Sequence, residues 1–415
     1  MQYAGIDIAK RAHVVGVRRE DGTPHGKPFK FDNDRQGFAS LLKRLAELGA
    51  GPDDCLLVME STGHYWLALW EFLSAHGLEV AVVNPVLTDA FRKADTLRKT
   101  KTDRIDAFQI AEYARFKRLG PSRVSPEDAE GLKQLTRYRS QLVRERTALK
   151  NRLTSIADRT FPELGGLVGG NDSATMRALM SECGSAEAIA STDVRTLAKT
   201  IRAASRGRYG REKADEVKAA ARASVGTTFA AKALAFEAGS VVGLVRRLDE
   251  EVKALDEEIA RLLDPEIGRI LESVPGIGPV CASTIAAEVG DPDRFESPRQ
   301  LFAFAGLESS KSQSGKFDGD ERHMSKRGSA YLREALMTAA DGARRNDPYF
   351  GDYYDSLVAR GKHHYVALSA VARKLCGVIL ALLRDRREYE PRESVQSVRA
   401  AEGAAGRVSG AQPSD

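Results

Sequence analysis

The chain has 415 residues, a hydrophobic fraction of 42% and a net charge of +5, with 63 Lys and Arg against 58 Asp and Glu. This length exceeds what one ordinary hydrophobic core occupies, and the basic residues cluster locally, so we expect two or three domains and a surface that fits a polyanion. No signal peptide, no zinc-type cysteine spacing and no apolar run approaching membrane-spanning length is found, which predicts a soluble cytoplasmic protein without a membrane partner.

Residues 1–122 are predicted to form one α/β domain. Three short strands, YAGIDIA, HVVGVRRED and KPFKFD, come first, and the Asp21-Gly22 turn favours antiparallel hairpins. A helix over NDRQGFASLLKRLAEL, a strand CLLVMES, a helix over GHYWLALWEFLSAHG, a strand EVAVVNP and a closing helix DRIDAFQIAEYARF follow. This order predicts a ribonuclease-H-like mixed sheet with helices on its faces.

Two heptad patterns within residues 123–264 predict long coiled-coil helices, paired either in one chain or between subunits. The first pattern is interrupted by Arg139 and Arg146, whereas the second is unbroken. The apolar positions are Leu132, Leu135, Leu142, Leu149, Leu153 and Ile156 in the first, and Val241, Val245, Leu248, Val252, Leu255, Ile259 and Leu262 in the second. The Ala-rich insertion between them, residues 161–236, is predicted to be helical.

Residues 265–388 are predicted to form a mostly helical domain, so that the whole chain combines an α/β part with an all-α part. ESVPGIGPVCASTIAAEVG indicates two helices joined by a glycine turn. A polar stretch, residues 308–329, separates two further helices, and a strongly apolar helix, HYVALSAVARKLCGVILALLR, comes last. Residues 389–415 are poor in hydrophobic side chains and are expected to be a disordered tail.

Four acidic residues of the first domain are candidates for a metal site. Asp7 lies between two isoleucines of the first strand, where a carboxylate is costly unless it is paired or binds metal. Glu60 ends another apolar strand, and Asp103 and Asp106 are spaced to share one helix face. If the strands are neighbours and the helix packs beside them, the four acids meet at one sheet edge. Oxygen ligands of this kind suit Mg²⁺ in a two-metal phosphodiester site.

Each of these acids also has a structural interpretation. Asp103 alone would cap a helix, Asp106 would be a solvated acid of the first turn, and Glu60 would be a strand-end charge. Asp7 is the hardest to explain in this way, because strand interiors seldom hold an unpartnered carboxylate. Four acids in the order D-E-D-D together favour the metal site.

The motifs GIDIAK, MESTGHY, VVNP and KTDRIDA resemble, in order and spacing, those of the DEDD transposases of bacterial insertion sequences, the insertion sequence one-ten family. The resemblance implies a domain similar to Holliday-junction resolvases of the RuvC type. It implies that Asp7, Glu60, Asp103 and Asp106 bind Mg²⁺, for which Mn²⁺ would substitute. Nearby basic residues would attract backbone phosphates to the metals, unless they form only a basic surface loop. They are Arg92, Lys93, Arg98, Lys99 and Lys101.

The last domain resembles the same family through VPGIGP, FAGLESS, QSGKF and SKRGSAYLREAL. The resemblance implies a serine nucleophile that becomes covalently linked to DNA, and Ser314 of the QSG motif matches it. Ser325 and Ser329 are competitors that the sequence does not exclude. A serine hydroxyl needs activation. His323 is the nearest histidine but fits an exposed loop equally well, so the metal-bound carboxylates are the better activator.

Further DNA contacts are expected in the last domain. VPGIGP resembles the helix-hairpin-helix DNA module, whose backbone N–H groups bind phosphate without regard to sequence. A structural tight turn is the alternative there, and a solvated helix face is the alternative for the basic side chains. The expected contacts are Gly276, Gly278, Lys316, Lys326, Arg327 and Arg333.

The predicted function is that of a DNA transposase or recombinase that cleaves by serine attack and exchanges strands. The resemblance implies donor and target DNA, a guide RNA encoded by the element, and a dimer or tetramer with composite active sites. One alternative is a metal-dependent resolvase-like nuclease in which water attacks. Another is a non-catalytic helical scaffold that binds nucleic acid. DNA ends linked to protein would distinguish the first hypothesis from the other two.

Overall fold

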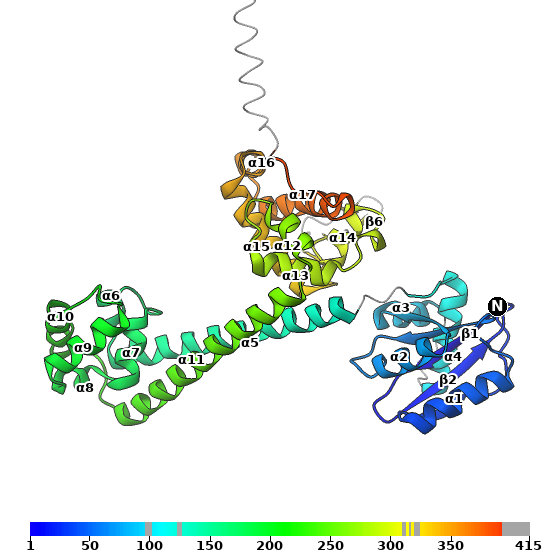
Figure 1. Ribbon diagram of the computed structural model, residues 1–415, viewed down its shortest axis with the longest axis horizontal. Coiled ribbons are helices and arrows are strands. Elements are labelled where there is room, and N and C mark those ends of the chain that lie inside the picture. The colour runs from blue at the N-terminus through cyan, green and yellow to red at the C-terminus, as the bar shows by residue number, and fades with distance from the viewer. Residues whose placement is uncertain (96–101, 123–126, 309–312, 315–316, 319–323, 392–415) are drawn as a thin grey trace, which may run out of the picture. The chain divides into compact units, whose positions relative to one another are not determined.

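The protein is described by a computed structural model, in which the chain divides into two compact units, residues 1–124 and 125–415 (Figure 1). The residues that the structure describes are 1–95, 102–122, 127–308, 313–314, 317–318 and 324–391.

The first unit is built on a five-stranded mixed sheet with the strand order β3-β2-β1-β4-β5. The strands are β1 (Gln2–Asp7), β2 (Ala12–Arg18), β3 (Phe29–Asp32), β4 (Cys55–Glu60) and β5 (Glu79–Val83). β1 pairs antiparallel with β2, and β2 with β3, whereas β1 with β4 and β4 with β5 are parallel. The predicted mixed sheet is therefore confirmed.

Helices cover both faces of this sheet because successive strand side chains point to opposite faces. α1 (Arg35–Glu47) and α2 (Leu67–Ala75) pack on one face, where Ile6, Leu57 and Met59 are buried. α4 (Asp103–Lys117) packs on the other face, against Leu56 and Val58. α3 (Pro85–Asp95) lies on the same side and contributes Phe91 to that core.

Two glycines bring α4 unusually close to the sheet. A Cβ atom added at Gly5 in β1 would lie 2.1 Å from the carbonyl oxygen of Ala107, and one added at Gly16 in β2 would lie 2.8 Å from the Phe108 ring. The missing side chains let the helix rest directly on both strands. This close packing fixes where the first turn of α4 lies relative to the end of β1.

The second unit begins with two long helices, α5 (Glu127–Thr160) and α11 (Ala231–Leu262), which pair antiparallel within the chain. The two arginines that interrupt the first heptad meet acids of the other helix. Arg139 pairs with Asp256, and the Nη1 atom of Arg146 lies 2.8 Å from Asp249 Oδ1. The arginines that interrupt the heptad pattern thus form ion pairs between the two long helices.

The Ala-rich insertion folds into short helices with a core of its own. Phe161, Ile189 and Ile201 are buried there together with the ends of the two long helices. The helices are α6 (Leu164–Leu167), α7 (Ala174–Glu182), α8 (Ala186–Ser191), α9 (Val194–Ala204) and α10 (Arg211–Arg222). The predicted helical character of this insertion is confirmed.

The remaining elements form a third helical core. They are α12 (Pro265–Glu272), α13 (Pro279–Val289), the 3₁₀ helix η1 (Pro292–Arg294), α14 (Pro298–Phe304), β6 (Gln313–Ser314), β7 (Phe317–Asp318), α15 (Ala330–Asn346), α16 (Pro348–Ala359) and α17 (His364–Asp385). Tyr389, at the start of the expected tail, is 9% exposed and its hydroxyl donates a 2.8 Å hydrogen bond to Asp347. The packed structure therefore extends to this residue.

α17 corrects one expectation from the sequence. Its 22 residues are long and apolar enough to cross a membrane by length and composition, although no such run was expected. Leu375, Cys376 and Ile379 are fully buried in the third helical core, and α15 and α16 pack against α17. Its apolar character is that of a central core helix.

Candidate active site

Asp7 and Glu60 lie at the ends of neighbouring parallel strands. Ile6 of β1 pairs with Met59 of β4, and each acid is the next residue of its strand. Strand alternation turns both acids to the face that α4 covers, because Tyr3 and Leu56, an even number of residues earlier, are buried on that face. Both side chains are partly buried.

α4 begins immediately beside these strand ends. Thr102 caps the helix, since its hydroxyl accepts a 3.4 Å hydrogen bond from the Ile105 amide, so Asp103 is not the cap. Asp103 and Asp106 both lie in the first turn, where the helix dipole favours negative charge. Asp106 is partly buried and Asp103 is exposed.

Three of the four predicted acids line one cavity of about 170 Å³. Its lining residues are Asp7, Glu60, Pro85, Thr88, Asp89, Arg92, Asp106, Gln109 and Ile110. Asp103 does not line it. Within the described ranges, no three acidic, histidine or cysteine side chains are gathered closely enough to hold an ion. The acidic donors in the cavity are carboxylates, which are the ligands that Mg²⁺ prefers.

α3 forms the wall of the cavity that the sequence analysis missed. The VVNP motif ends in Asn84, whose side chain accepts a 2.9 Å hydrogen bond from the Val86 amide, and Pro85 occupies the first helical position. Thr88 and Asp89 then face the cavity one turn later. Helical spacing of both apolar and polar residues after this motif was the sequence signal for this helix.

The charges on α3 are paired with one another. Arg92 Nη2 lies 2.7 Å from Asp89 Oδ1, and Lys93 Nζ lies 2.6 Å from Asp89 Oδ2. Hydrogen bonds from Lys93 and Arg92 lower the pKa of Asp89 to about 2. The Asp89 hydrogen bond raises the pKa of Arg92, and the charge of Asp106 adds to that effect. Arg92 is therefore a positively charged side chain that lines the acidic cavity.

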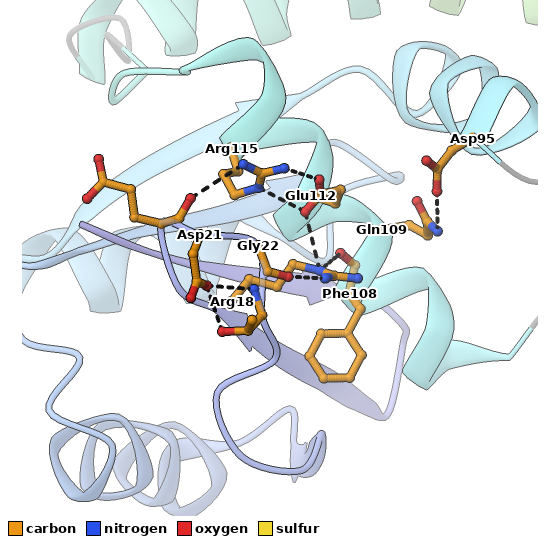
Figure 2. A network of polar contacts seen from close by, with 10 residues as sticks. Arg18, Asp21, Gly22, Asp95, Phe108, Gln109, Glu112 and Arg115 are labelled. Atoms are coloured by element: carbon orange, nitrogen blue, oxygen red, sulfur yellow. Dashed lines mark hydrogen bonds and ion pairs between the residues drawn. The ribbon is translucent and has the colours of Figure 1, made fainter.

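A polar network holds α4 in place along its length (Figure 2). Arg18 Nε of β2 donates a 3.2 Å hydrogen bond to the Phe108 carbonyl, and the same nitrogen lies 3.6 Å from Glu112 Oε2. Gln109 Nε2 donates to Asp95 Oδ2 at 3.1 Å and so links α4 to α3. The helix that carries two of the predicted acids is anchored on both sides.

Ser314 lies in a short two-stranded antiparallel sheet of the second unit. It belongs to β6, and its backbone pairs antiparallel with Phe317 of β7. Several predicted residues lie outside the described residues. They are Arg98, Lys99, Lys101, Lys316 and His323.

The two competing serines both hydrogen-bond to residues 304–308. The Ser329 hydroxyl accepts a 3.1 Å hydrogen bond from the Leu332 amide and caps α15, while the Ser325 hydroxyl lies 3.5 Å from the Gly306 carbonyl. Backbone hydrogen bonds run from Ser325 to Glu308 at 2.7 Å and from Ser329 to Phe304 at 2.8 Å. Ser329 thus has a structural role.

The expected phosphate contacts differ in their surroundings. Lys326 and Arg327 are exposed, whereas Arg333 donates a 3.0 Å hydrogen bond to the Ala305 carbonyl. Gly278 is exposed at the start of α13. The other glycine, Gly276, is tightly packed, because a Cβ atom there would lie 2.3 Å from the Ala343 amide nitrogen. At Gly276 the alternative of a structural turn has direct support.

Two protein-family models match separate stretches of the chain. A family model of DEDD-type insertion-sequence transposases, described as "Transposase", matches residues 4–162. A second family model, described as "Transposase IS116/IS110/IS902 family", matches residues 268–355. The cavity acids and Ser314 fall within these two stretches.

Full-length relatives agree with the family models. An IS116 insertion-element protein of Streptomyces clavuligerus is 28% identical over 94% of this chain and 96% of its own. A probable family 20 transposase of Pseudomonas aeruginosa is 28% identical over 93% and 98%. A pilin gene-inverting protein of Moraxella bovis is 23% identical over 94% and 98%. The chain belongs to the IS116/IS110/IS902 family of transposases, enzymes that cleave and transfer DNA strands.

Proposed function

We propose that this transposase breaks and rejoins DNA at an insertion sequence with a divalent-cation site in the first unit and a serine nucleophile in the second. Asp7, Glu60 and Asp106 would move closer together than in this structure to hold Mg²⁺, and Asp103 would complete the D-E-D-D set from its exposed position one turn before Asp106. Ser314 would attack the DNA. The single observation that carries the proposal is that three of these acids line one cavity.

The fold supports a RuvC-like interpretation of the first unit. A sheet with three antiparallel strands followed by two parallel ones, with acids ending β1 and β4 and opening α4, suits a ribonuclease-H-like nuclease. Bound Mg²⁺ would stabilise the negative charge that builds on the phosphate during strand transfer. Arg92 at the cavity offers a second positive charge for a phosphate oxygen.

The proposed chemistry exchanges one phosphate ester for another. The Ser314 oxygen forms a bond to phosphorus while the bond from phosphorus to a bridging sugar oxygen breaks. The serine proton is lost and the released sugar oxygen gains one, so the number of ester bonds is conserved. Because the DNA remains linked to protein, a second sugar hydroxyl can reverse the exchange on another strand.

The partners are proposed on the same basis. The substrate would be donor and target DNA, and the pilin gene-inverting relative is consistent with recombination between two sites. Membership of the family further suggests an element-encoded guide RNA. It also suggests a dimer or tetramer in which the acids of one copy serve the serine of another. Action on chromosomal DNA would place the protein in the cytoplasm, at the nucleoid.

Incubation with DNA carrying the element ends tests the proposal on a denaturing gel. Wild type with Mg²⁺ should give a band shifted by covalent protein. The band should disappear with a chelator, in Asp7→Asn and in Ser314→Ala. Free DNA ends without a shifted band would instead identify a nuclease that uses water. Cleavage that persists with the chelator would contradict a metal site.

A further inference from the structure

The side chain of Thr88 on α3 contacts one of the proposed metal ligands. Thr88 is only 5% exposed, and its hydroxyl donates a 2.5 Å hydrogen bond to Glu60 Oε1. The same hydroxyl oxygen lies 3.0 Å from the Pro85 carbonyl, three residues earlier. Thr88 and Glu60 both line the acidic cavity.

The hydroxyl has one hydrogen atom, so the two acceptors compete for it. A bond to an ionised carboxylate is shorter and stronger than one to a neutral carbonyl, and the Glu60 contact is the shorter of the two. In a helix, the β-branched threonine side chain is restricted to few rotamers. The Thr88 hydroxyl is therefore held in a position from which it donates to Glu60.

The other oxygen of Glu60 has a much weaker neighbour. Thr62 is exposed, and its hydroxyl lies 3.5 Å from Glu60 Oε2, at the limit of a hydrogen bond. Among the contacts of Glu60 in the described residues, the Thr88 bond is the short and buried one. Thr62 consequently serves as a matched control for a second hydroxyl near the same carboxylate.

We propose that Thr88 is a positioning residue whose hydroxyl orients Glu60 toward the cavity and thereby sets the affinity for a divalent cation. The inference rests on the proposed metal role of Glu60. Groups that hydrogen-bond a metal ligand fix its direction, and their removal costs about 10–100-fold in metal affinity or activity. α3 would then contribute to the site through a residue that does not touch the ion.

Mn²⁺ binding to the full-length protein, followed by electron paramagnetic resonance, tests the inference directly. Thr88→Val keeps the side-chain shape and removes the hydroxyl, so it should weaken Mn²⁺ binding about 10-fold or more. Thr88→Ser retains the hydroxyl and should bind Mn²⁺ within about 3-fold of wild type, as should Thr62→Val. Thermal unfolding without metal checks that each variant is folded, and Thr88→Ala replaces Thr88→Val if the latter is not.

The outcomes separate this inference from the function on which it rests. If wild type and Glu60→Gln bind Mn²⁺ equally, Glu60 is not a ligand, and both proposals fail. If Glu60→Gln weakens binding but folded Thr88→Val binds as wild type does, only the Thr88 inference is overturned. It is also overturned if Thr88→Ser or Thr62→Val loses as much affinity as Thr88→Val.

Discussion

The backbone of Gly5 in β1 lies against the carbonyl oxygen of Ala107 in α4 so closely that a Cβ atom at Gly5 would be 2.1 Å from it. Asp7 follows Gly5 on the same face of the same strand, and Asp106 immediately precedes Ala107. The missing side chain at Gly5 therefore sets the distance between β1, which carries Asp7, and α4, which carries Asp106. Packing and chemistry are coupled at this point of the fold.

Gly5→Ala should therefore damage both stability and activity. The added methyl group has to push α4 away from β1, and overpacking of this kind costs about 1–3 kcal/mol. Urea denaturation measures the loss of stability, and strand-transfer activity should decrease as well. Gly51→Ala is the control, because a Cβ atom there meets nothing within 4 Å. Equal stability of Gly5→Ala and wild type would show that α4 does not rest on the strand.

Alanine substitution should reduce stability at Ser329 and should abolish the covalent chemistry at Ser314. Ser329→Ala removes the cap of α15 and should lower the free energy of unfolding by about 1 kcal/mol. Ser314→Ala should leave stability unchanged and abolish the covalent protein–DNA product. Denaturation curves and the denaturing gel, measured on both variants, check this. A covalent product that survives in Ser314→Ala would exclude it as the nucleophile.

Arg137 of α5 and Glu288 of α13 form an ion pair with a buried carboxylate and a partly exposed guanidinium, with Nε–Oε1 at 2.6 Å and Nη2–Oε2 at 2.9 Å. The Glu288 side chain is 0% exposed, so Arg137→Met would remove the cation that hydrogen-bonds a buried carboxylate. We expect a loss of about 3 kcal/mol by chemical denaturation. The double variant Arg137→Met with Glu288→Met should recover much of it. A double variant that is less stable than the single one would contradict this explanation.

Glu112 gives the first unit a predictable response to acid. The hydrogen bond from Arg115, helped by the charges of Arg115 and Arg18, lowers the pKa of Glu112 below its usual 4.5. A lowered folded pKa means that the stabilisation is complete above pH 4.5 and is lost as pH falls through the folded value. The stability difference between wild type and Glu112→Gln should be constant near neutral pH and shrink in acid. A stability difference between wild type and Glu112→Gln that grows as pH falls would contradict a lowered pKa of Glu112.

Local patterns predicted the sheet and the places of Asp7 and Glu60, because strand alternation and apolar runs report directly on burial. α3 was not predicted. Its apolar residues do have helical spacing, but Thr88 is the only residue of α3 that is buried, so the sequence pattern does not show what α3 packs against. The partner of Arg139, Asp256, lies 117 residues away, and such ion pairs across long helices leave no local signal. Thr88 and Asp89 were missed because their importance arises from where α3 packs.

The central claim is that Asp7, Glu60 and Asp106 hold a divalent cation. Anomalous X-ray diffraction from crystals of the full-length protein grown with Mn²⁺ tests it most directly. The account predicts anomalous peaks in the cavity, within coordination distance of carboxylate oxygens of these three residues. Mn²⁺ peaks found only elsewhere, or none in the cavity at a Mn²⁺ concentration that supports strand transfer, would contradict it.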